Sequence, residues 1–374
     1  MIKRIFIFMA NFIYMFFKIL PTKNRITMIS RQSNNITTDF KLMKDNFEKN
    51  HKDISVIVLC RKLEGGEKAS VRNKIEYIFH CFKQMYYIST SKVLVLDSYC
   101  ILASILKHRK SLKIIQIWHS MGTMKKFGYQ ILGMQEGSSL KTAQIMKMHK
   151  NYTYAFASSE NYAKYLAEGF GCSTDIIKIF SLPRVDLLTS KEYKEKISSR
   201  IIELYPKIRE KKNIVYCPTF RKNEDQMQKE IKKLIDAIDY EKYNLILKLH
   251  PLSKIKIDNS NVIYDKSFSS FDMLFVADYV ISDYSCIIYE AAILNIPLYF
   301  WTFDFNQYIG ARGVTFNYKK EVPGPVCRDI NKIVNSIENE KYDMKKLENF
   351  RIKYVTNIEN CTDKICDFVY KLMQ

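Results

Sequence analysis

Residues 279–294, YVISDYSCIIYEAAIL, place a short apolar run directly before a polar turn and a second apolar stretch. The run 279–282 is rich in β-branched and aromatic residues and predicts a buried strand, whereas residues 287–294 predict a helix. A strand followed at once by a turn and a helix is the repeating unit of parallel sheets. This stretch therefore predicts an α/β fold.

The alternation of strand and helix extends over most of the chain. Apolar runs that predict strands lie at residues 26–30, 54–60, 93–97, 114–119, 154–158, 214–217, 245–249, 262–264, 279–282 and 297–301. Longer amphipathic segments, such as residues 71–87, separate several of these runs. The pattern indicates parallel sheets covered on both faces by helices.

A chain of 374 residues can bury two such cores. We expect two Rossmann-like domains with parallel sheets that face a central cleft, because ligands of open α/β sheets bind beyond the carboxyl ends of the strands. The expected parts are a membrane-associating segment, an N-terminal domain, a charged linker, a C-terminal domain and a final helical segment, at residues 1–21, 22–190, 191–212, 213–343 and 344–374.

The charge balance points to polyanionic partners. The chain has 59 lysines and arginines against 39 acidic residues, a net charge of +20. Nucleic acid, anionic lipid head groups or a phosphate-rich substrate would suit this balance, and solvated lysines without a partner would produce it too. No nucleic-acid-binding motif is visible, so a nucleic-acid partner is not expected.

The nine cysteines occur singly, their number is odd and no C-x-x-C pair exists. This distribution predicts thiols in a reducing compartment rather than disulfides or a zinc site. No Asp-x-Asp motif occurs either, so the sequence predicts no dedicated metal site.

The N-terminus is unusually apolar. Residues 5–20 are broken only by Asn11 and Lys18, follow Lys3 and Arg4, and end at Pro21. The stretch lacks the cleavage site of a signal peptide and is short for a full membrane span. We expect a helix that lies on the cytoplasmic face of a membrane, with a single span and a helix docked on the protein as alternatives.

The turn at residues 282–286 is a candidate anion site. The free N–H groups at the start of a helix favour negative charge, and Ser285 could cap the helix and touch a phosphate oxygen. Capping by Asp283 and Ser285 without any ligand would use the same residues.

A second candidate follows the first strand of the second half, where Thr219 and Arg221 place a hydroxyl and a guanidinium two residues apart. Arginine can form two parallel hydrogen bonds to phosphate oxygens. A surface arginine in a turn is the alternative.

Two of the six histidines are expected at strand ends, one in each half of the chain. His119 precedes Gly122, Lys125 and Lys126, whose glycine allows a tight turn and whose lysines add positive charge. His250 precedes a proline, which restricts its backbone to an extended shape. A structural histidine at a strand end is the alternative in both places.

Taken together, these segments resemble the CDP-glycerol glycerophosphotransferases of teichoic acid synthesis. The resemblance covers roughly residues 90–330 and includes the segments 118–119, 125–126, 182–188, 218–221, 249–251, 282–285, 312–313 and 322–325. It implies a GT-B-type fold and a membrane-associated cytoplasmic enzyme. It also implies transfer of a polyol phosphate, glycerol phosphate first, from a CDP-activated donor to a lipid-linked or glycan acceptor.

The resemblance also implies roles for individual residues. His119 matches the histidine proposed as general base on the acceptor hydroxyl, and His250 matches its partner beside the donor phosphates. The positions that match the surroundings of CDP and its diphosphate are Thr219, Arg221, Asp283, Ser285 and Cys286. Candidate contacts for the acceptor or for the cleft are Ser120, Gly122, Lys125 and Lys126. Both CDP-glycerol and CDP-ribitol fit as donors, and Mg²⁺ could accompany either.

Two departures from the family pattern stand out. The family has Trp-His-Gly followed by Thr-Pro-Leu, whereas Ser120-Met121-Gly122 precedes Thr123 here, which leaves the acceptor and the polyol open. Cys286 replaces the usual second serine, although a backbone N–H would serve a phosphate equally well.

Two other functions remain as alternatives. A GT-B glycosyltransferase that uses a nucleotide sugar would employ Glu290 to hold the ribose. A basic membrane-surface or nucleic-acid-binding protein without catalysis would show salt-sensitive binding and no turnover of any donor.

Overall fold

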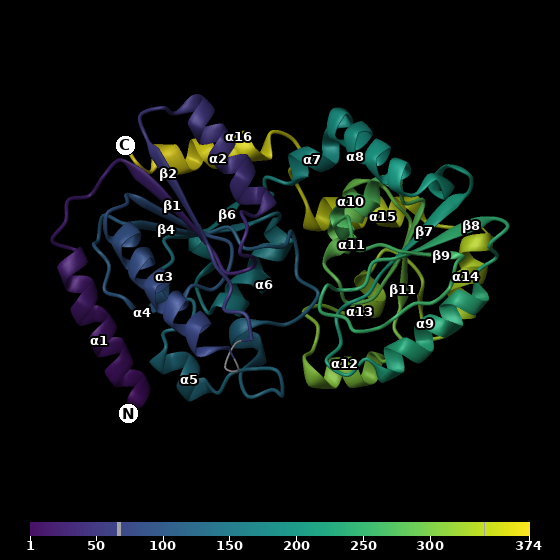
Figure 1. Ribbon diagram of the computed structural model, residues 1–374, viewed down its shortest axis with the longest axis horizontal. Coiled ribbons are helices and arrows are strands. Elements are labelled where there is room, and N and C mark those ends of the chain that lie inside the picture. The colour runs from purple at the N-terminus through teal and green to yellow at the C-terminus, as the bar shows by residue number, and fades with distance from the viewer. Residues whose placement is uncertain (66–68, 340) are drawn as a thin grey trace. The chain divides into compact units, whose positions relative to one another are not determined.

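The computed structural model describes residues 1–65, 69–339 and 341–374. Contacts between residues divide the chain into two compact units. Unit 1 comprises Met1–Ser120, Lys126–Asp186 and Glu359–Gln374, and unit 2 comprises Met121–Lys125 and Leu187–Ile358. Figure 1 shows that each unit contains a sheet with helices around it.

Unit 1 is built on a six-stranded parallel sheet with the order β2-β1-β3-β4-β5-β6. The strands are β1 Arg25–Ser30, β2 Ser55–Cys60, β3 Val93–Leu96, β4 Lys113–Gln116, β5 Tyr154–Ala157 and β6 Ile177–Ile179. Every residue of β1 and β3 is buried, as expected for strands that are covered on both faces.

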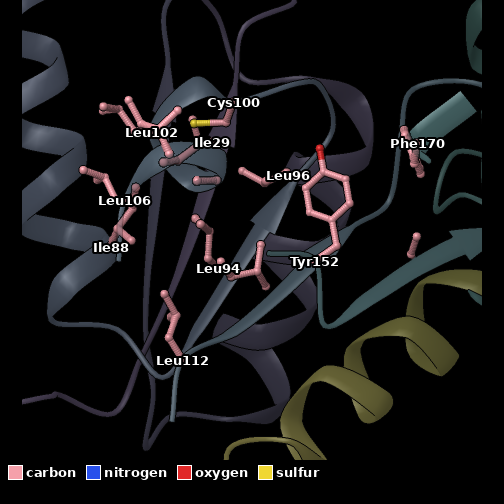
Figure 2. Packing of buried hydrophobic residues seen from close by; sticks show 14 of the residues in the cluster. Ile29, Ile88, Leu94, Leu96, Cys100, Leu102, Leu106, Leu112, Tyr152 and Phe170 are labelled. Atoms are coloured by element: carbon pink, nitrogen blue, oxygen red, sulfur yellow. The ribbon is translucent and has the colours of Figure 1, made fainter. Parts of the chain in front are cut away.

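Apolar side chains from β3 and from the helices beside it form the core of unit 1 (Figure 2). Leu94 and Leu96 of β3 pack in one cluster with Ile88, Tyr152 and Phe170, all of them buried. Burying a side chain of this size contributes roughly 1.5–3 kcal/mol, so this cluster is a main source of the stability of unit 1.

The helices of unit 1 carry clear start and stop signals. Ser159 caps α6 by accepting a hydrogen bond from the Tyr162 N–H, and Gly171 ends it at a φ of 60°, where glycine pays no steric cost. The helices and 3₁₀ turns of this unit are α1 Ile2–Phe17, α2 Thr38–Asn50, α3 Val71–Ser89, α4 Ile101–Ile105, η2 Gly128–Ile131, α5 Leu140–Ile145, α6 Glu160–Phe170, η3 Thr174–Ile176 and α16 Cys361–Lys371. The C-terminal helix α16 lies beside α2 (Figure 1).

Unit 2 repeats the plan with a six-stranded parallel sheet of order β12-β11-β10-β7-β8-β9. Its strands are β7 Lys212–Cys217, β8 Tyr243–Leu247, β9 Val262–Tyr264, β10 Tyr279–Ser282, β11 Leu298–Trp301 and β12 Val326–Cys327. Buried side chains of β7, β8, β10 and β11 pack against α9 and α14 to form its core.

Helix α7, Val185–Thr189, contains the point at which the chain passes from unit 1 to unit 2, after Asp186. The helices and 3₁₀ turns that follow in unit 2 are α8 Lys191–Leu204, η4 Pro206–Arg209, α9 Asp225–Ala237, α10 Ser270–Met273, η5 Leu274–Val276, α11 Ile287–Ile293, α12 Phe305–Ala311, α13 Tyr318–Glu321, α14 Ile330–Glu338 and α15 Met344–Tyr354.

The two parallel sheets confirm the predicted α/β class. The charged stretch expected as a linker, residues 191–212, consists of α8, η4 and the first residue of β7, and all of it groups with unit 2. The expected C-terminal helical segment contains two helices, of which α15 groups with unit 2 and α16 with unit 1. All nine cysteines are free thiols.

Helix α1 docks on unit 1 by one narrow face. Ala10 and Tyr14 are buried, the Tyr14 hydroxyl lies 3.0 Å from Nδ1 of His108, and the Asn11 amide donates to the Ile105 carbonyl at 3.1 Å. Among the residues that the structure describes, no helix combines the length and the apolar character needed to cross a membrane.

Candidate active site

In unit 1 the strand order reverses at β1, with β2 on one side and β3 on the other. Such a reversal is where ligands of open parallel sheets bind. The loops that follow β1, β3 and β4 at this edge carry Gln32, Asp97 and His119, and they bring these side chains into contact.

The backbone before His119 is unusual. β4 ends at Gln116, earlier than the predicted end at residue 119, because Trp118 takes a left-handed conformation with φ of 62°. A bulky residue rarely adopts this conformation and needs surrounding support. Here the Trp118 ring stacks on Phe127 at 4.9 Å, and the Trp118 N–H donates to the Gln116 side chain at 3.0 Å.

One nitrogen of the His119 ring is engaged within unit 1. Its Nδ1 lies 3.2 Å from the Asp97 carbonyl oxygen and 3.1 Å from the Gln32 amide nitrogen. The Asp97 carbonyl oxygen can only accept, so this contact favours the tautomer with hydrogen on Nδ1, and the Gln32 amide fits the same tautomer with its oxygen rather than its nitrogen turned towards the ring. Nε2 then carries a lone pair that can take a proton.

The pKa of His119 is lowered to about 4, mainly by burial; the hydrogen bond to the Asp97 carbonyl opposes this shift, the charge of Arg184 adds to it, and the charge of Asp39 opposes it. The ring is therefore neutral at pH 7. Neighbouring Asp97 shows the opposite shift, because burial raises the pKa of its carboxyl group to about 6.

An ion pair beside His119 ties two distant parts of unit 1 together. Asp39, buried at the start of α2, accepts hydrogen bonds from the Arg184 backbone N–H at 2.9 Å and from the Arg184 Nε at 3.0 Å. Arg184 belongs to the segment 182–188 of the resemblance. Asp186 of the same segment accepts from the N–H groups of Cys361 and Thr362, each at 2.8 Å, and so holds the start of α16.

In unit 2 the strand order reverses at β7, between β8 and β10. The loops after β7 and β10 carry Thr219, Arg221 and Asp283, and the structure brings these three residues together. The Asp283 Oδ1 accepts from the backbone N–H of Thr219 at 2.8 Å and of Tyr284 at 2.5 Å, and its Oδ2 accepts from Arg221 at 2.8 Å. Its backbone carbonyl accepts from the Tyr318 hydroxyl at 2.8 Å.

Arg221 is held on several sides. Besides Asp283, its Nε donates to Asp304 at 2.7 Å and its Nη1 donates to the Thr219 carbonyl at 2.6 Å. The guanidinium also lies 4.9 Å from the centre of the Tyr308 ring, which stacks on Tyr284. Two carboxylates thus balance this arginine, and its main effect in this state is to fix the two loops.

The turn that follows β10 differs in detail from the expectation. α11 begins at Ile287 with Cys286 as its N-cap residue, which makes no side-chain cap. Ser285 was expected to cap the helix, but its hydroxyl only approaches the Ile287 N–H at 3.5 Å. The Thr219 Oγ1 is buried and has no hydrogen-bond partner among the described residues.

His250 lies three residues after the end of β8, and its side chain is exposed to solvent. Its Nδ1 accepts from the Leu252 N–H at 3.1 Å, and its ring packs beside Phe220 at 5.0 Å. In the neutral ring the proton then sits on Nε2, which makes His250 a hydrogen-bond donor to an incoming oxygen. The two histidines thus present opposite functions at Nε2, an acceptor in His119 and a donor in His250.

The four candidate acceptor contacts are divided between the units. Ser120 and Lys126 group with unit 1, whereas Gly122 and Lys125 group with unit 2. Lys125 forms an isolated antiparallel bridge with Val314 there.

Sequence reasoning missed several residues that hold these positions, namely Gln32, Asp39, Asp97, Asp304 and Tyr318. Only Asp97 carried a signal, as a polar residue at the end of a predicted strand. Within residues 1–65, 69–339 and 341–374, no group of three or more histidine, cysteine or acidic side chains could hold a metal ion. Mg²⁺ with the donor stays a prediction.

The family model described as CDP-glycerol:poly(glycerophosphate) glycerophosphotransferase matches residues 12–371. The chain belongs to this family. The resemblance found in the motifs and the expected phosphotransferase class are thereby confirmed.

Curated relatives in the glycerophosphotransferase family come from wall polymer synthesis. The chain is 28% identical over 363 residues to a teichoic acid ribitol-phosphate primase of Bacillus spizizenii, covering 94% of this chain and 92% of the primase. It is 32% identical over 302 residues to a teichoic acid glycerol-phosphate primase of Bacillus subtilis, covering 79% of this chain and 77% of that protein.

Among solved structures, the wall teichoic acid polymerase TagF superposes with a TM-score of 0.77 at 18% identity, covering 100% of this chain and 95% of that chain. A UDP-GlcNAc 2-epimerase of Neisseria meningitidis superposes with a TM-score of 0.59 at 14% identity, covering 93% of this chain and 99% of the epimerase. At these identities the likeness concerns the fold, and it confirms the predicted GT-B-type architecture.

Replacing Arg221 by Met should cost about 3–5 kcal/mol of the free energy of unfolding, because Asp283 and Asp304 would stay buried without their cation. Arg221→Lys should recover only part of this loss, since lysine cannot form the same fork of hydrogen bonds. Urea denaturation measures the effect, with exposed Arg209→Met as the matched control. Unchanged stability in Arg221→Met would contradict the organising role.

Acid should destabilise the protein through His119. The folded ring has a pKa of about 4 and the unfolded ring about 6.5, so between these values the unfolded chain binds more protons. The free energy of unfolding should therefore fall as pH drops from about 6.5 to 4. The raised pKa of Asp97 acts in the opposite direction, so the difference between wild type and His119→Gln isolates the histidine. Identical pH slopes for the two proteins would refute the lowered pKa.

Proposed function

We propose that this protein transfers a polyol phosphate, glycerol phosphate first and ribitol phosphate second, from a CDP-activated donor to a hydroxyl group of a lipid-linked or glycan acceptor. The product would be teichoic acid or a related cell-surface polymer, and CMP would be released. The observation that carries the proposal is a neutral His119 with Nε2 available, within a chain that belongs to the glycerophosphotransferase family from residue 12 to 371.

In the proposed reaction the acceptor oxygen attacks the phosphorus that bears the polyol. A new phosphate ester bond forms, the anhydride bond to the CMP phosphate breaks, and its electron pair leaves with CMP. The proton of the acceptor hydroxyl passes to Nε2 of His119. General base catalysis of this kind contributes about 10²- to 10⁴-fold.

Unit 2 would hold the donor. The Asp283 carboxylate and Arg221 fix the loops after β7 and β10, and the buried Thr219 hydroxyl would bind a phosphate oxygen. His250 would donate from Nε2 to the diphosphate, where charge develops as CMP leaves. Mg²⁺ bound with the donor would add further charge neutralisation.

The alternatives gain less support. Similarity to UDP-GlcNAc 2-epimerases reflects a shared fold at 14% identity. Glu290, the ribose contact expected of a nucleotide-sugar enzyme, is buried within α11. Family membership favours phosphoryl transfer over both glycosyl transfer and a binding protein without catalysis.

The test is CMP release from CDP-glycerol and CDP-ribitol, with UDP-sugars and CMP-sugars as a comparison panel and membrane lipid extract as acceptor. His119→Ala and His250→Ala should each lose at least about a hundredfold in rate. His51→Ala, a half-buried histidine of unit 1 that stacks on Tyr370, is the matched control.

Mass spectrometry of the product distinguishes one added unit from a ladder of units, and glycerol from ribitol. If nucleotide is released only from the sugar donors, the proposed phosphotransferase is wrong and the glycosyltransferase alternative is supported. Full activity of His119→Ala and His250→Ala would contradict the proposed roles of the two histidines but not the proposed reaction.

We propose further that the protein binds the cytoplasmic face of the membrane as a peripheral protein through α1. One face of α1 is docked, and the rest exposes Ile5, Phe8, Phe12, Met15 and Phe16, with Phe8 69% accessible. The neighbouring helix α3 exposes further apolar side chains, namely Val71, Ile75, Ile78, Phe79 and Phe82. A contiguous apolar surface of this kind marks an interaction site.

The charged residues on the surface formed by α1 and α3 indicate which kind of partner it binds. Lys3 and Arg4 on α1 and Lys74 and Lys83 on α3 are exposed, within a chain of net charge +20. Apolar side chains flanked by cations suit an anionic lipid surface, where lysine and arginine contact head groups and the apolar side chains enter the interface.

The double substitution Phe8→Ser and Phe12→Ser should weaken binding to anionic phospholipid vesicles at least about tenfold, because less apolar area enters the interface. Cosedimentation measures binding, and Ile352→Ser, an exposed apolar residue of unit 2, is the control. Equal binding of the double variant and wild type would contradict this surface.

A further inference from the structure

The segment Met121–Lys125 lies two residues after His119 but is built into unit 2. The Thr315 N–H donates to the Met124 carbonyl at 3.1 Å, and the Thr315 hydroxyl donates to the Thr123 carbonyl at 2.7 Å. The bridge between Lys125 and Val314 continues this pairing. The segment is thus fixed at consecutive positions along its backbone.

Side-chain packing fixes the same segment. Met121 and Met124 are fully buried. Gly122 lies against the Tyr289 ring so closely that a Cβ atom there would approach a ring carbon to 2.2 Å. Only glycine fits this approach.

This anchoring places the Lys125 side chain near the loops after β7 and β10. Its electrostatic neighbours are Asp283 and Cys286, which favour the charged form, and Arg221 and Arg312, which disfavour it. Burial is the largest influence, and it lowers the pKa of Lys125. The ammonium group therefore lies within a cluster in which cations outnumber carboxylates.

The acidic neighbour is already occupied. Both Asp283 oxygens bind other donors, from Thr219, Tyr284 and Arg221. No acceptor among the described residues forms a hydrogen bond or an ion pair with the Lys125 ammonium. A half-buried cation without an acceptor is costly, and proteins retain such groups where a ligand supplies the counter-charge.

A second polar group in the same cluster also lacks a partner. The Thr219 Oγ1 is buried and has no hydrogen-bond partner among the described residues, and the Thr219 backbone N–H binds the Asp283 carboxylate, whose charge acts on Lys125. A hydroxyl donor and an ammonium donor beside one loop fit an anion with several oxygens.

We propose that Lys125, with the Thr219 hydroxyl, binds the diphosphate of the CDP-polyol donor in unit 2. The inference rests on the proposed function and assigns Lys125 to the donor, whereas the sequence suggested a contact with the acceptor or the cleft. Arg221, balanced by two carboxylates, then holds the loops, and Lys125 supplies the charge that the diphosphate meets.

Titration calorimetry of the full chain with inorganic pyrophosphate and with CDP-glycerol tests the assignment. Lys125→Met should weaken both ligands about 10- to 100-fold, the loss expected for a charge-assisted hydrogen bond. Lys125→Arg should retain most of the affinity. Lys232→Met removes an exposed lysine from α9 of the same unit and should leave the affinity unchanged.

Thermal unfolding provides a second readout. Without ligand, Lys125→Met should be at least as stable as wild type, because it removes a cation that lacks a partner. Pyrophosphate should raise the melting temperature of wild type and of Lys232→Met, but much less that of Lys125→Met.

The outcomes separate the two proposals. Lys125-dependent binding of pyrophosphate without turnover of any CDP-polyol would uphold the anion site and reject the proposed function. Turnover and binding that are unchanged in Lys125→Met would reject the assignment and keep the function. Strong destabilisation of unliganded Lys125→Met would show that the lysine is structural and overturn the inference.

Discussion

The Asp283 carboxylate at the carboxyl ends of β7 and β10 is the interaction on which the site in unit 2 depends. One oxygen binds the backbone of both loops and the other binds Arg221, which in turn binds Asp304. A buried carboxylate is tolerated only with such compensation. The loops therefore keep one shape, and the donors that point away from Asp283 are positioned before a ligand arrives.

Unit 1 also contains a buried carboxylate paired with an arginine, and this pair lies near His119. The left-handed backbone of Trp118 directly precedes His119, whose Nδ1 contacts the Asp97 carbonyl, and the charges of the Asp39–Arg184 pair act on the ring. Strain at Trp118 and burial of the ring are both unfavourable for folding. In return the imidazole is neutral at pH 7 and has a defined tautomer, which is the state that a general base requires.

The residues to which we assign functions lie at positions that are unfavourable for the stability of the fold. A left-handed tryptophan, an ammonium without an acceptor, a buried hydroxyl without a partner and a helix that exposes phenylalanines each cost stability. The tryptophan and the hydroxyl lie two residues beyond the ends of β4 and β7, the ammonium lies in the segment Met121–Lys125, and the helix lies on the surface of unit 1. The proposals give each feature a role, with His119 as base after the tryptophan, a diphosphate as ligand of the ammonium and the hydroxyl, and a membrane as partner of the helix.

The sequence alone determined the α/β class, the number of sheets and the positions of most strands, because these follow from local hydrophobic periodicity and short polar turns. It also determined the family, through His119, His250 and the turn at residues 282–286. Tertiary structure decided the rest. Periodicity does not tell which donors of Arg221 are already used, or that Gly122 and Lys125 pack in unit 2 while Ser120 and Lys126 pack in unit 1. Nor does it tell that the charge of Arg184 acts on His119. These facts depend on contacts between residues far apart in the chain, and only folding brings those residues together.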